Sequence, residues 1–190
     1  MGDKGTVWMP EQASTLAAEI DGLFYFVYWI SLILFVGVIG AMIYFAFKYR
    51  SKGDREHEPA PLPEHKAMEA AWIVIPLILC LLVFTWGFKS YLKLNLAPPN
   101  AYPIQVRASS WAWNFTYPNG TAVGTELHVP VDRPVKLTMS SEDVLHSFFV
   151  PEFRVKFDVL PNRYTSVWFE ATELGEYDIF CTEYCGTGHS

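Results

Sequence analysis

Two long stretches without any charged residue dominate the first half of the chain. They cover residues 22–47 and 70–88, or 26 and 19 positions. At about 1.5 Å per helical residue they reach about 39 and 28 Å, against about 30 Å for the hydrocarbon core of a bilayer. Two buried helices of a soluble bundle are the alternative. Uncharged runs of this length favour membrane spans, because one charge at the bilayer centre costs about 2.5 kcal/mol or more.

The basic residues around these stretches predict how the helices are oriented. Residues 1–21 contain one lysine against four acids, which also argues against a signal peptide. The segment 48–69 contains five bases: Lys48, Arg50, Lys52, Arg55 and Lys66. By the positive-inside rule this loop is cytoplasmic. We therefore expect a helical hairpin whose N-terminus and C-terminal domain both face outward.

From residue 98 onward the hydrophobic period changes to two. The segment WAWNFTY (111–117) alternates and is expected to place its four aromatic side chains on one face of a strand, and Pro118-Asn119-Gly120 predicts a turn. Further short strands are expected at 126–129, 135–139, 146–150, 164–171 and 176–181. This series predicts a small sandwich or barrel. The predicted domains are thus a transmembrane hairpin (1–97) and a β-domain (98–190).

Composition and charge narrow the possible functions. Half of the residues are hydrophobic (51%) and 16% are aromatic, which excludes a disordered chain. The formal net charge of −6 makes nucleic acid an unsuitable partner, since phosphate binding relies on a basic surface. Three cysteines are too few for a disulfide framework, so each needs its own explanation.

The candidate chemistry lies at the end of the chain. Cys181-Thr-Glu-Tyr-Cys185-Gly-Thr-Gly-His189 places two thiols and an imidazole on one loop, and His146 begins an earlier strand. A Cys181–Cys185 disulfide suits an exported domain, and zinc accepts two cysteines and two histidines. Zinc motifs usually pair ligands on both arms, however, whereas copper electron-transfer sites take one upstream histidine and their other ligands from a single loop. Two thiolates can bridge two copper ions.

Two segments resemble subunit II of cytochrome c oxidase in its dinuclear copper (CuA) domain. They are SSEDVLHSF (140–148) and CTEYCGTGHS (181–190). The order of the hairpin, the WAW strand, the segment FRVKFDVLPNRYT (153–165) and the cysteine loop is similar over nearly the whole chain, and that segment is similar to bacterial members. The resemblance implies an α+β membrane protein, in which a two-helix transmembrane hairpin precedes a cupredoxin-like Greek-key β-sandwich.

The resemblance also implies a set of metal ligands. Copper would be held by the side chains of His146, Cys181, Cys185 and His189 and by the backbone carbonyl of Glu183. The Glu183 side chain would help to bind magnesium at the interface with subunit I. The family pattern H-S-x-M places a further axial methionine two residues beyond Ser190, so we expect the natural polypeptide to continue past this point.

Other residues have roles implied only by the resemblance. Trp111 would receive electrons from cytochrome c, Glu142 and Asp143 would form part of an acidic docking surface, and Glu69 would lie at the entrance of a proton-uptake route. From the residues alone, Trp111 is a core residue of a strand, Asp143 a turn cap and Glu69 an interfacial carboxylate, and these alternatives stay open. Ala112 departs from the family, which often has an aromatic residue there.

The implied function is that of an electron-accepting subunit. It would take electrons from cytochrome c, or from a fused or partner cytochrome c domain, and pass them to haem in subunit I. Oxygen would be reduced to water there, with proton translocation, in a complex with other oxidase subunits and membrane lipid. The expected location is the bacterial cytoplasmic membrane. A quinol oxidase subunit would lack the copper cysteines, and a membrane-tethered copper carrier or assembly factor would lack the WAW strand. Four residues have no ligand-like companion in the sequence: His57, His65, Cys80 and His128.

Overall fold

The computed structural model describes residues 5–50 and 64–189. The chain forms two compact units, one made of Met1–Gly22 with Phe88–Ser190 and the other of Leu23–Gly87. The predicted limits of the two domains, 1–97 and 98–190, stay a prediction. Two of the bases that predicted a cytoplasmic loop, Lys52 and Arg55, and also His57, lie outside the described residues.

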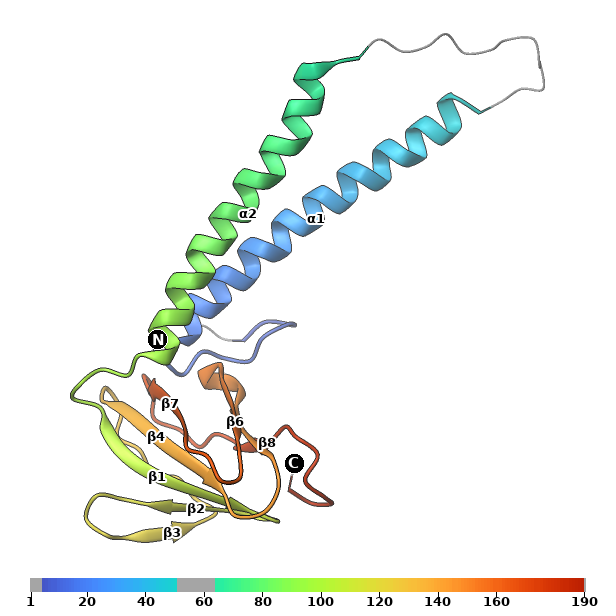
Figure 1. The fold of residues 1–190 in the computed structure, drawn as a ribbon. Coiled ribbons are helices and arrows are strands. Elements are labelled where there is room, and N and C mark those ends of the chain that lie inside the picture. The colour runs from blue at the N-terminus through green and yellow to red at the C-terminus, as the bar shows by residue number, and fades with distance from the viewer. Residues whose placement is uncertain (1–4, 51–63, 190) are drawn as a thin grey trace. The chain divides into compact units, whose positions relative to one another are not determined.

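Two long helices carry the charge-free stretches. Helix α1 runs over Ala17–Lys48 and α2 over Lys66–Asn95 (Figure 1). Both are long and apolar enough to cross a membrane, and the most apolar window of each is not buried in the protein. In the unit Leu23–Gly87 the two helices touch, with the rings of Phe26 and Trp86 5.3 Å apart. Helix α2 contains Pro76, which membrane helices tolerate more readily than soluble ones do.

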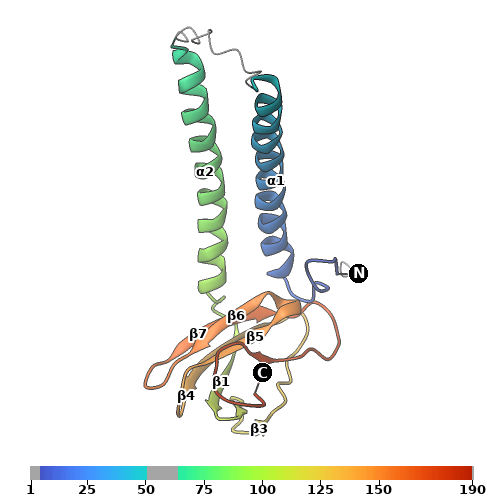
Figure 2. The ribbon, with the colours of Figure 1, turned by 90° about the vertical axis from the view of Figure 1, so that its right-hand side faces the viewer.

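The β-domain consists of two sheets (Figures 1 and 2). The larger sheet has the order β3-β2-β1-β4-β7 and the smaller one β6-β5-β8. The strands are β1 (Tyr102–Ser109), β2 (Ala112–Thr116), β3 (Ala122–Gly124), β4 (Pro134–Ser141), β5 (His146–Val150), β6 (Val155–Val159), β7 (Thr165–Glu170) and β8 (Phe180–Cys181). Strands β1 and β4 are parallel, and all other pairs are antiparallel. The predicted order of two long apolar helices followed by a β-sandwich is confirmed.

The hydrophobic core lies between the two sheets. Phe115 and Phe169 from the larger sheet and Phe148 from the smaller one are fully buried. Two residues from the N-terminal segment, Ala13 and Leu16, join the same core at 1% exposure. The residues that precede α1 are therefore part of the β-domain.

The alternating segment 111–117 is a strand only from Ala112 to Thr116. Within it Trp113 and Phe115 are buried, as expected. The prediction that Trp111 shares this face is wrong, because Trp111 lies in the preceding turn and is 57% exposed. The turn at Pro118-Asn119-Gly120 is confirmed, with Gly120 N donating to the Tyr117 carbonyl.

Two predicted strands are wrong in part or in whole. Residues 126–129 form no strand, because the Tyr117 hydroxyl bonds both the N–H and the carbonyl of His128, at 2.7 and 3.0 Å, where a neighbouring strand would otherwise do so. Of the segment 176–181 only Phe180–Cys181 is a strand. Residues of both segments line one cavity of about 890 Å³.

Candidate metal centre

Sheet register brings the first two candidate ligands together. His146 is the first residue of β5 and is fully buried. Strand β8 pairs with β5 so that Cys181 lies opposite Phe148, and Thr182 N then donates to the Ser147 carbonyl at 3.1 Å. Because side chains alternate along a strand, Phe148 and His146 share a face. Cys181 therefore ends its strand beside His146.

The loop after β8 supplies the other two ligands. It carries Cys185 and returns the chain to His189, which is 9% exposed. Gly186 and Gly188 have φ angles of 120° and 89°. These left-handed conformations are open to glycine and rarely to other residues. The two glycines thus allow the short stretch from Cys185 to His189 to turn so that both of these side chains face the same point.

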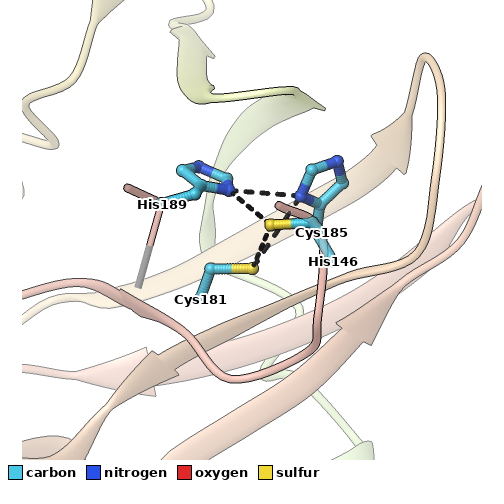
Figure 3. Close-up of side chains that lie close together, drawn as sticks. All are labelled: His146, Cys181, Cys185 and His189. Atoms are coloured by element: carbon cyan, nitrogen blue, oxygen red, sulfur yellow. Dashed lines mark hydrogen bonds between the residues drawn. The ribbon is translucent and has the colours of Figure 1, made fainter. Parts of the chain in front are cut away.

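Four side chains converge there (Figure 3). The Sγ atoms of Cys181 and Cys185 are 3.6 Å apart, and Cys185 Sγ is 3.2 Å from His189 Nδ1. His146 Nδ1 is 3.8 Å from Cys181 Sγ and 3.3 Å from His189 Nδ1. All four candidate ligand atoms lie within 4.8 Å of one another, and no other such group occurs in residues 5–50 and 64–189. A disulfide needs sulfurs about 2.05 Å apart, so the two cysteines are free thiols.

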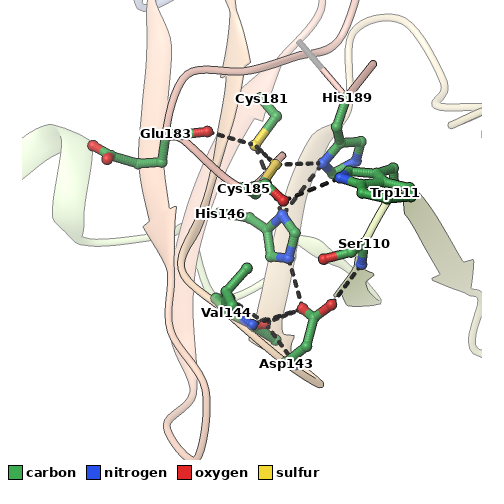
Figure 4. A network of polar contacts seen from close by, with 10 residues as sticks. Ser110, Trp111, Asp143, Val144, His146, Cys181, Glu183, Cys185 and His189 are labelled. Carbon is green, nitrogen blue, oxygen red and sulfur yellow. Dashed lines mark hydrogen bonds and ion pairs between the residues drawn. The ribbon is translucent and has the colours of Figure 1, made fainter. Parts of the chain in front are cut away.

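A carboxylate fixes the orientation of His146. Asp143 Oδ1 lies 2.9 Å from His146 Nε2, and Asp143 Oδ2 accepts a bond from Ser110 N at 2.7 Å (Figure 4). These bonds from Ser110 and His146 hold the pKa of the Asp143 carboxyl well below its usual range. A carboxylate on Nε2 leaves Nδ1 free for a metal, as in many metal sites where a second residue orients the ligand. Sequence reasoning assigned Asp143 to docking and missed this role.

The electrostatics of the cluster suit a cation. Burial and the hydrogen bond with Cys181 raise the pKa of the Cys185 thiol to about 11. Burial, with the charge of His146 next in effect, lowers the pKa of His189. The site therefore disfavours both a bare thiolate and an imidazolium. A bound cation would displace the thiol proton and use the neutral imidazoles as ligands.

Trp111 lies against the cysteine loop. Its Nε1 donates to the Cys185 carbonyl at 3.0 Å, while more than half of the side chain stays exposed (Figure 4). A Cβ on Gly186 would come within 2.4 Å of that Nε1. The contact between indole and loop thus depends on the absence of a side chain at position 186.

Glu183 presents its backbone, and not its carboxylate, to the cluster. Its carbonyl oxygen is 3.7 Å from Cys181 Sγ, and Figure 4 shows the carboxylate pointing away. The ring of Trp113 lies 5.2 Å from that of His189 and 6.0 Å from that of His146. The alternation of the WAW strand signalled that Trp113 is buried, but not that it covers both imidazoles.

The remaining candidates lie elsewhere. Glu142 is exposed, 4.0 Å from Arg107, and Glu69 is exposed in the first turn of α2. Cys80 lies on α2 and His128 is 3.3 Å from Glu126; neither belongs to the metal-ligand group, and nor does His65. The structure thus brings together Trp111, Asp143 and the Glu183 carbonyl with the four ligands, and Glu69 belongs to the other compact unit.

Two family profiles match the chain. The profile described as cytochrome C oxidase subunit II, transmembrane domain, matches residues 3–90, and that of the periplasmic domain of the same subunit matches residues 120–190. Together they cover more than four-fifths of the sequence. The chain belongs to the cytochrome c oxidase subunit II family. The resemblance stated from the sequence is confirmed.

Two relatives are similar to this subunit II chain over most of its length. Cytochrome c oxidase subunit 2 of Synechocystis is 28% identical, covering 95% of this chain and 69% of the relative, and that of Thermostichus vulcanus is 29% identical, covering 95% and 71%. Among solved structures, the periplasmic domain of subunit II of cytochrome oxidase from Bradyrhizobium japonicum is 27% identical. It covers 50% of this chain and 80% of that one, with a TM-score of 0.47.

The donor set of this subunit II chain fits a copper site. Two sulfurs and two imidazole nitrogens lie within 4.8 Å of one another, and thiolate with imidazole is a combination that copper accepts. His189 Nε2 is buried with no partner among the described residues, so His189 has only its Nδ1 engaged, and that atom faces the cluster. The chain is thus a membrane protein that carries a candidate copper site on its β-domain.

Proposed function

We propose that this chain is the electron-accepting subunit of a bacterial terminal oxidase. It receives single electrons from cytochrome c at a dinuclear copper centre and delivers them to haem in subunit I, where oxygen is reduced to water with proton translocation. The observation that carries this proposal is the convergence of two free thiols and two imidazoles within 4.8 Å. Copper held there supplies one-electron redox chemistry at a thiolate-rich site.

Five residues would hold the metal. The proposed ligands are the side chains of His146, Cys181, Cys185 and His189 and the carbonyl of Glu183. Two thiols only 3.6 Å apart are suited to bridging two ions, since each sulfur can face both. One histidine lies on β5 and the other at the end of the loop, and each would contribute one imidazole nitrogen to the metal centre. The Glu183 carboxylate, directed away from the cluster, is free to bind magnesium at the interface with subunit I.

Trp111 is the proposed route by which electrons reach the site. It is the large aromatic side chain that is both exposed and bonded to the cysteine loop, through the Cys185 carbonyl. Cytochrome c would dock over it, attracted by acidic groups that include Glu142 and Asp143. The Asp143 carboxylate is already engaged by Ser110 and His146, so we assign most of the steering to exposed acids such as Glu142, which lies 4.0 Å from Arg107.

Glu69 is proposed to lie near the cytoplasmic mouth of a proton-uptake route in the assembled oxidase. It stands at the start of α2, immediately before the charge-free stretch. The bases of the 48–69 loop support a cytoplasmic position for this end of the helix. The β-domain and the N-terminus then face the outer side of the membrane.

Copper content and electron paramagnetic resonance of the purified oxidase test the proposal. We expect two coppers in subunit II and a mixed-valence signal shared between them. Trp111→Ala should leave that signal unchanged and slow the reduction of copper by cytochrome c. A single copper of ordinary type, zinc, or copper that is released to an acceptor protein would refute it, and the last result would instead identify a copper carrier.

A further inference from the structure

A segment before the first membrane helix is built into the β-domain. Ala13 N donates to the Glu152 carbonyl and Thr15 N to the Glu170 carbonyl, both at 3.0 Å. Ser14 forms a bridge with Ala171 at the end of β7, and its hydroxyl donates to the Phe153 carbonyl. This segment therefore joins the turn that leads into β6, in the smaller sheet, to the end of β7 in the larger one.

An ion pair closes the same region. Arg154 donates from Nε to Asp21 Oδ1 and from Nη2 to Asp21 Oδ2, both at 2.8 Å. Gln12 Nε2 also donates to Oδ2, at 2.9 Å. The side chains of Arg154 and Asp21 are only 6% and 7% exposed. We call these three residues the Asp21 lock.

The arginine also binds backbone carbonyls. Nη2 donates to the Pro10 carbonyl and Nη1 to the Pro151 carbonyl, both at 2.7 Å. Its guanidinium thus joins the N-terminal segment, the 3₁₀ turn Pro151–Phe153 and α1 at one point. A planar group with five donors can do this, whereas a lysine ammonium cannot reproduce the paired bonds.

The backbone of Arg154 is unusual for an arginine. Its φ angle is 55°, in the left-handed region where glycine is the default residue. Such conformations persist in other residues only where the surroundings over-determine them. Position 154 therefore holds an arginine although its backbone conformation favours glycine. This indicates that the contacts of the arginine side chain compensate for the unfavourable backbone.

The lock is connected to both the membrane helix and the copper site. Asp21 is the last charged residue before the 26-residue charge-free stretch of α1. Arg154 directly precedes β6, whose Val159 pairs with His146. One ion pair thus ties the first turns of α1 to the strand that supports a proposed copper ligand, all within one compact unit.

We infer that Arg154 and Asp21 are positioning residues for electron delivery. By fixing how α1 begins on the β-domain, the Asp21 lock would hold β6 and His146 in one arrangement relative to the first turns of α1, and electron transfer to the partner subunit would depend on that arrangement. The inference rests on the proposed function. It also gives a reason for an ion pair here, because a buried pair often stabilises a fold no more than apolar residues of similar volume do, whereas its paired bonds define one geometry.

Rapid reduction of cytochrome c in the assembled oxidase tests the inference by separating two steps. The first is reduction of copper, and the second is transfer from copper to haem. In Arg154→Met we expect an unchanged copper signal, an unchanged first step, and a second step that is several-fold slower and heterogeneous. Lys156→Met is the matched control, since Lys156 lies two residues away on β6 in an exposed pair with Asp158. It should leave both steps unchanged.

Two further variants separate positioning from stability. The apolar pair Asp21→Leu/Arg154→Met should recover much of the thermal stability that Arg154→Met loses, because no unpaired charge stays buried. The apolar pair should not restore the rate of electron transfer from copper to haem. Arg154→Lys keeps the positive charge and should therefore retain part of that rate. The inference is overturned if the second step is normal in Arg154→Met, or if it follows thermal stability across all variants. Should Arg154→Met fail to assemble, the apolar pair alone decides. Absence of copper in the unmodified oxidase would instead refute the proposed function.

Discussion

Adding one methyl group at Gly186 should uncouple Trp111 from the copper site. In the structure a Cβ at this position would lie 2.4 Å from Trp111 Nε1 and 2.9 Å from Cε2. So short a contact requires either the loop or the indole to move. The indole has room to move because it is 57% exposed. We expect Gly186→Ala to displace the indole, break its bond to the Cys185 carbonyl and slow electron transfer from cytochrome c about as much as Trp111→Ala does.

Two contributions make up the cost in stability. The φ angle of 120° is strained for alanine, at about 1–3 kcal/mol. The steric overlap adds about 1–3 kcal/mol if the indole stays. If the indole rotates away, the overlap is replaced by the loss of a half-exposed hydrogen bond, about 0.5–1.5 kcal/mol. Movement of the indole is therefore the less costly response.

Gly188→Ala provides the matched control. Gly188 lies on the same loop with a φ angle of 89°, and a Cβ there would meet nothing within 4 Å. It carries the backbone strain without the overlap, so it should lower stability while leaving reduction by cytochrome c unchanged. Placing Gly186→Ala in a Trp111→Ala background should reduce its cost to that of Gly188→Ala, as expected for residues in contact.

Stopped-flow oxidation of cytochrome c, the copper spectrum and the thermal midpoint for loss of that spectrum measure these effects. Equal rates for the Gly186→Ala and Gly188→Ala proteins would refute the argument. A large change in the copper spectrum of Gly186→Ala, with an unmoved indole, would show that the loop yields instead of the tryptophan.

Three further variants test other parts of the site. Replacing Cys181 or Cys185 by serine should abolish the mixed-valence signal, because one sulfur cannot bridge both ions; a wild-type spectrum in either variant would contradict the bridging role. Asp143→Asn should weaken copper retention about 10–100-fold in chelator competition, since the carboxylate that orients His146 is lost, and an unchanged affinity would reduce Asp143 to a turn residue. Glu69→Ala should lower steady-state oxygen consumption with the copper signal intact; equal turnover would leave Glu69 an interfacial carboxylate.

Local patterns predicted the elements whose signal is local. The charge-free stretches gave both helices, and the apolar run at 146–150 coincides with β5. Strand β1 was missed, although Ile104, Val106 and Ala108 alternate and are buried. It forms a hairpin with β2, but the two turn residues are Ser110 and Trp111, and neither is one of the glycine, proline, asparagine or aspartate residues that usually mark a turn.

Failures occurred where a tertiary contact decided the conformation. The segment 126–129 has strand-forming residues, but the hydroxyl of Tyr117 takes the backbone groups of His128. The N-terminal residues Ala13 and Leu16 read as a flank of the first helix, yet they are buried in the β-domain core. Neither outcome is visible in hydrophobic periodicity, because both depend on residues distant in sequence.

The candidate ligands could be found from the sequence because metal sites restrict both residue type and spacing. The residues that hold those ligands could not, since a backbone N–H such as that of Ser110 has no sequence signature at all. Its bond fixes one oxygen of Asp143, the other oxygen fixes His146, and Gly186 admits Trp111 to the carbonyl of Cys185. The residues that make these contacts position the ligands or the cysteine loop but do not themselves bind the metal. Substitutions at such positions should therefore alter the rate of electron transfer or the copper affinity without abolishing the mixed-valence signal, whereas loss of Cys181 or Cys185 should abolish it.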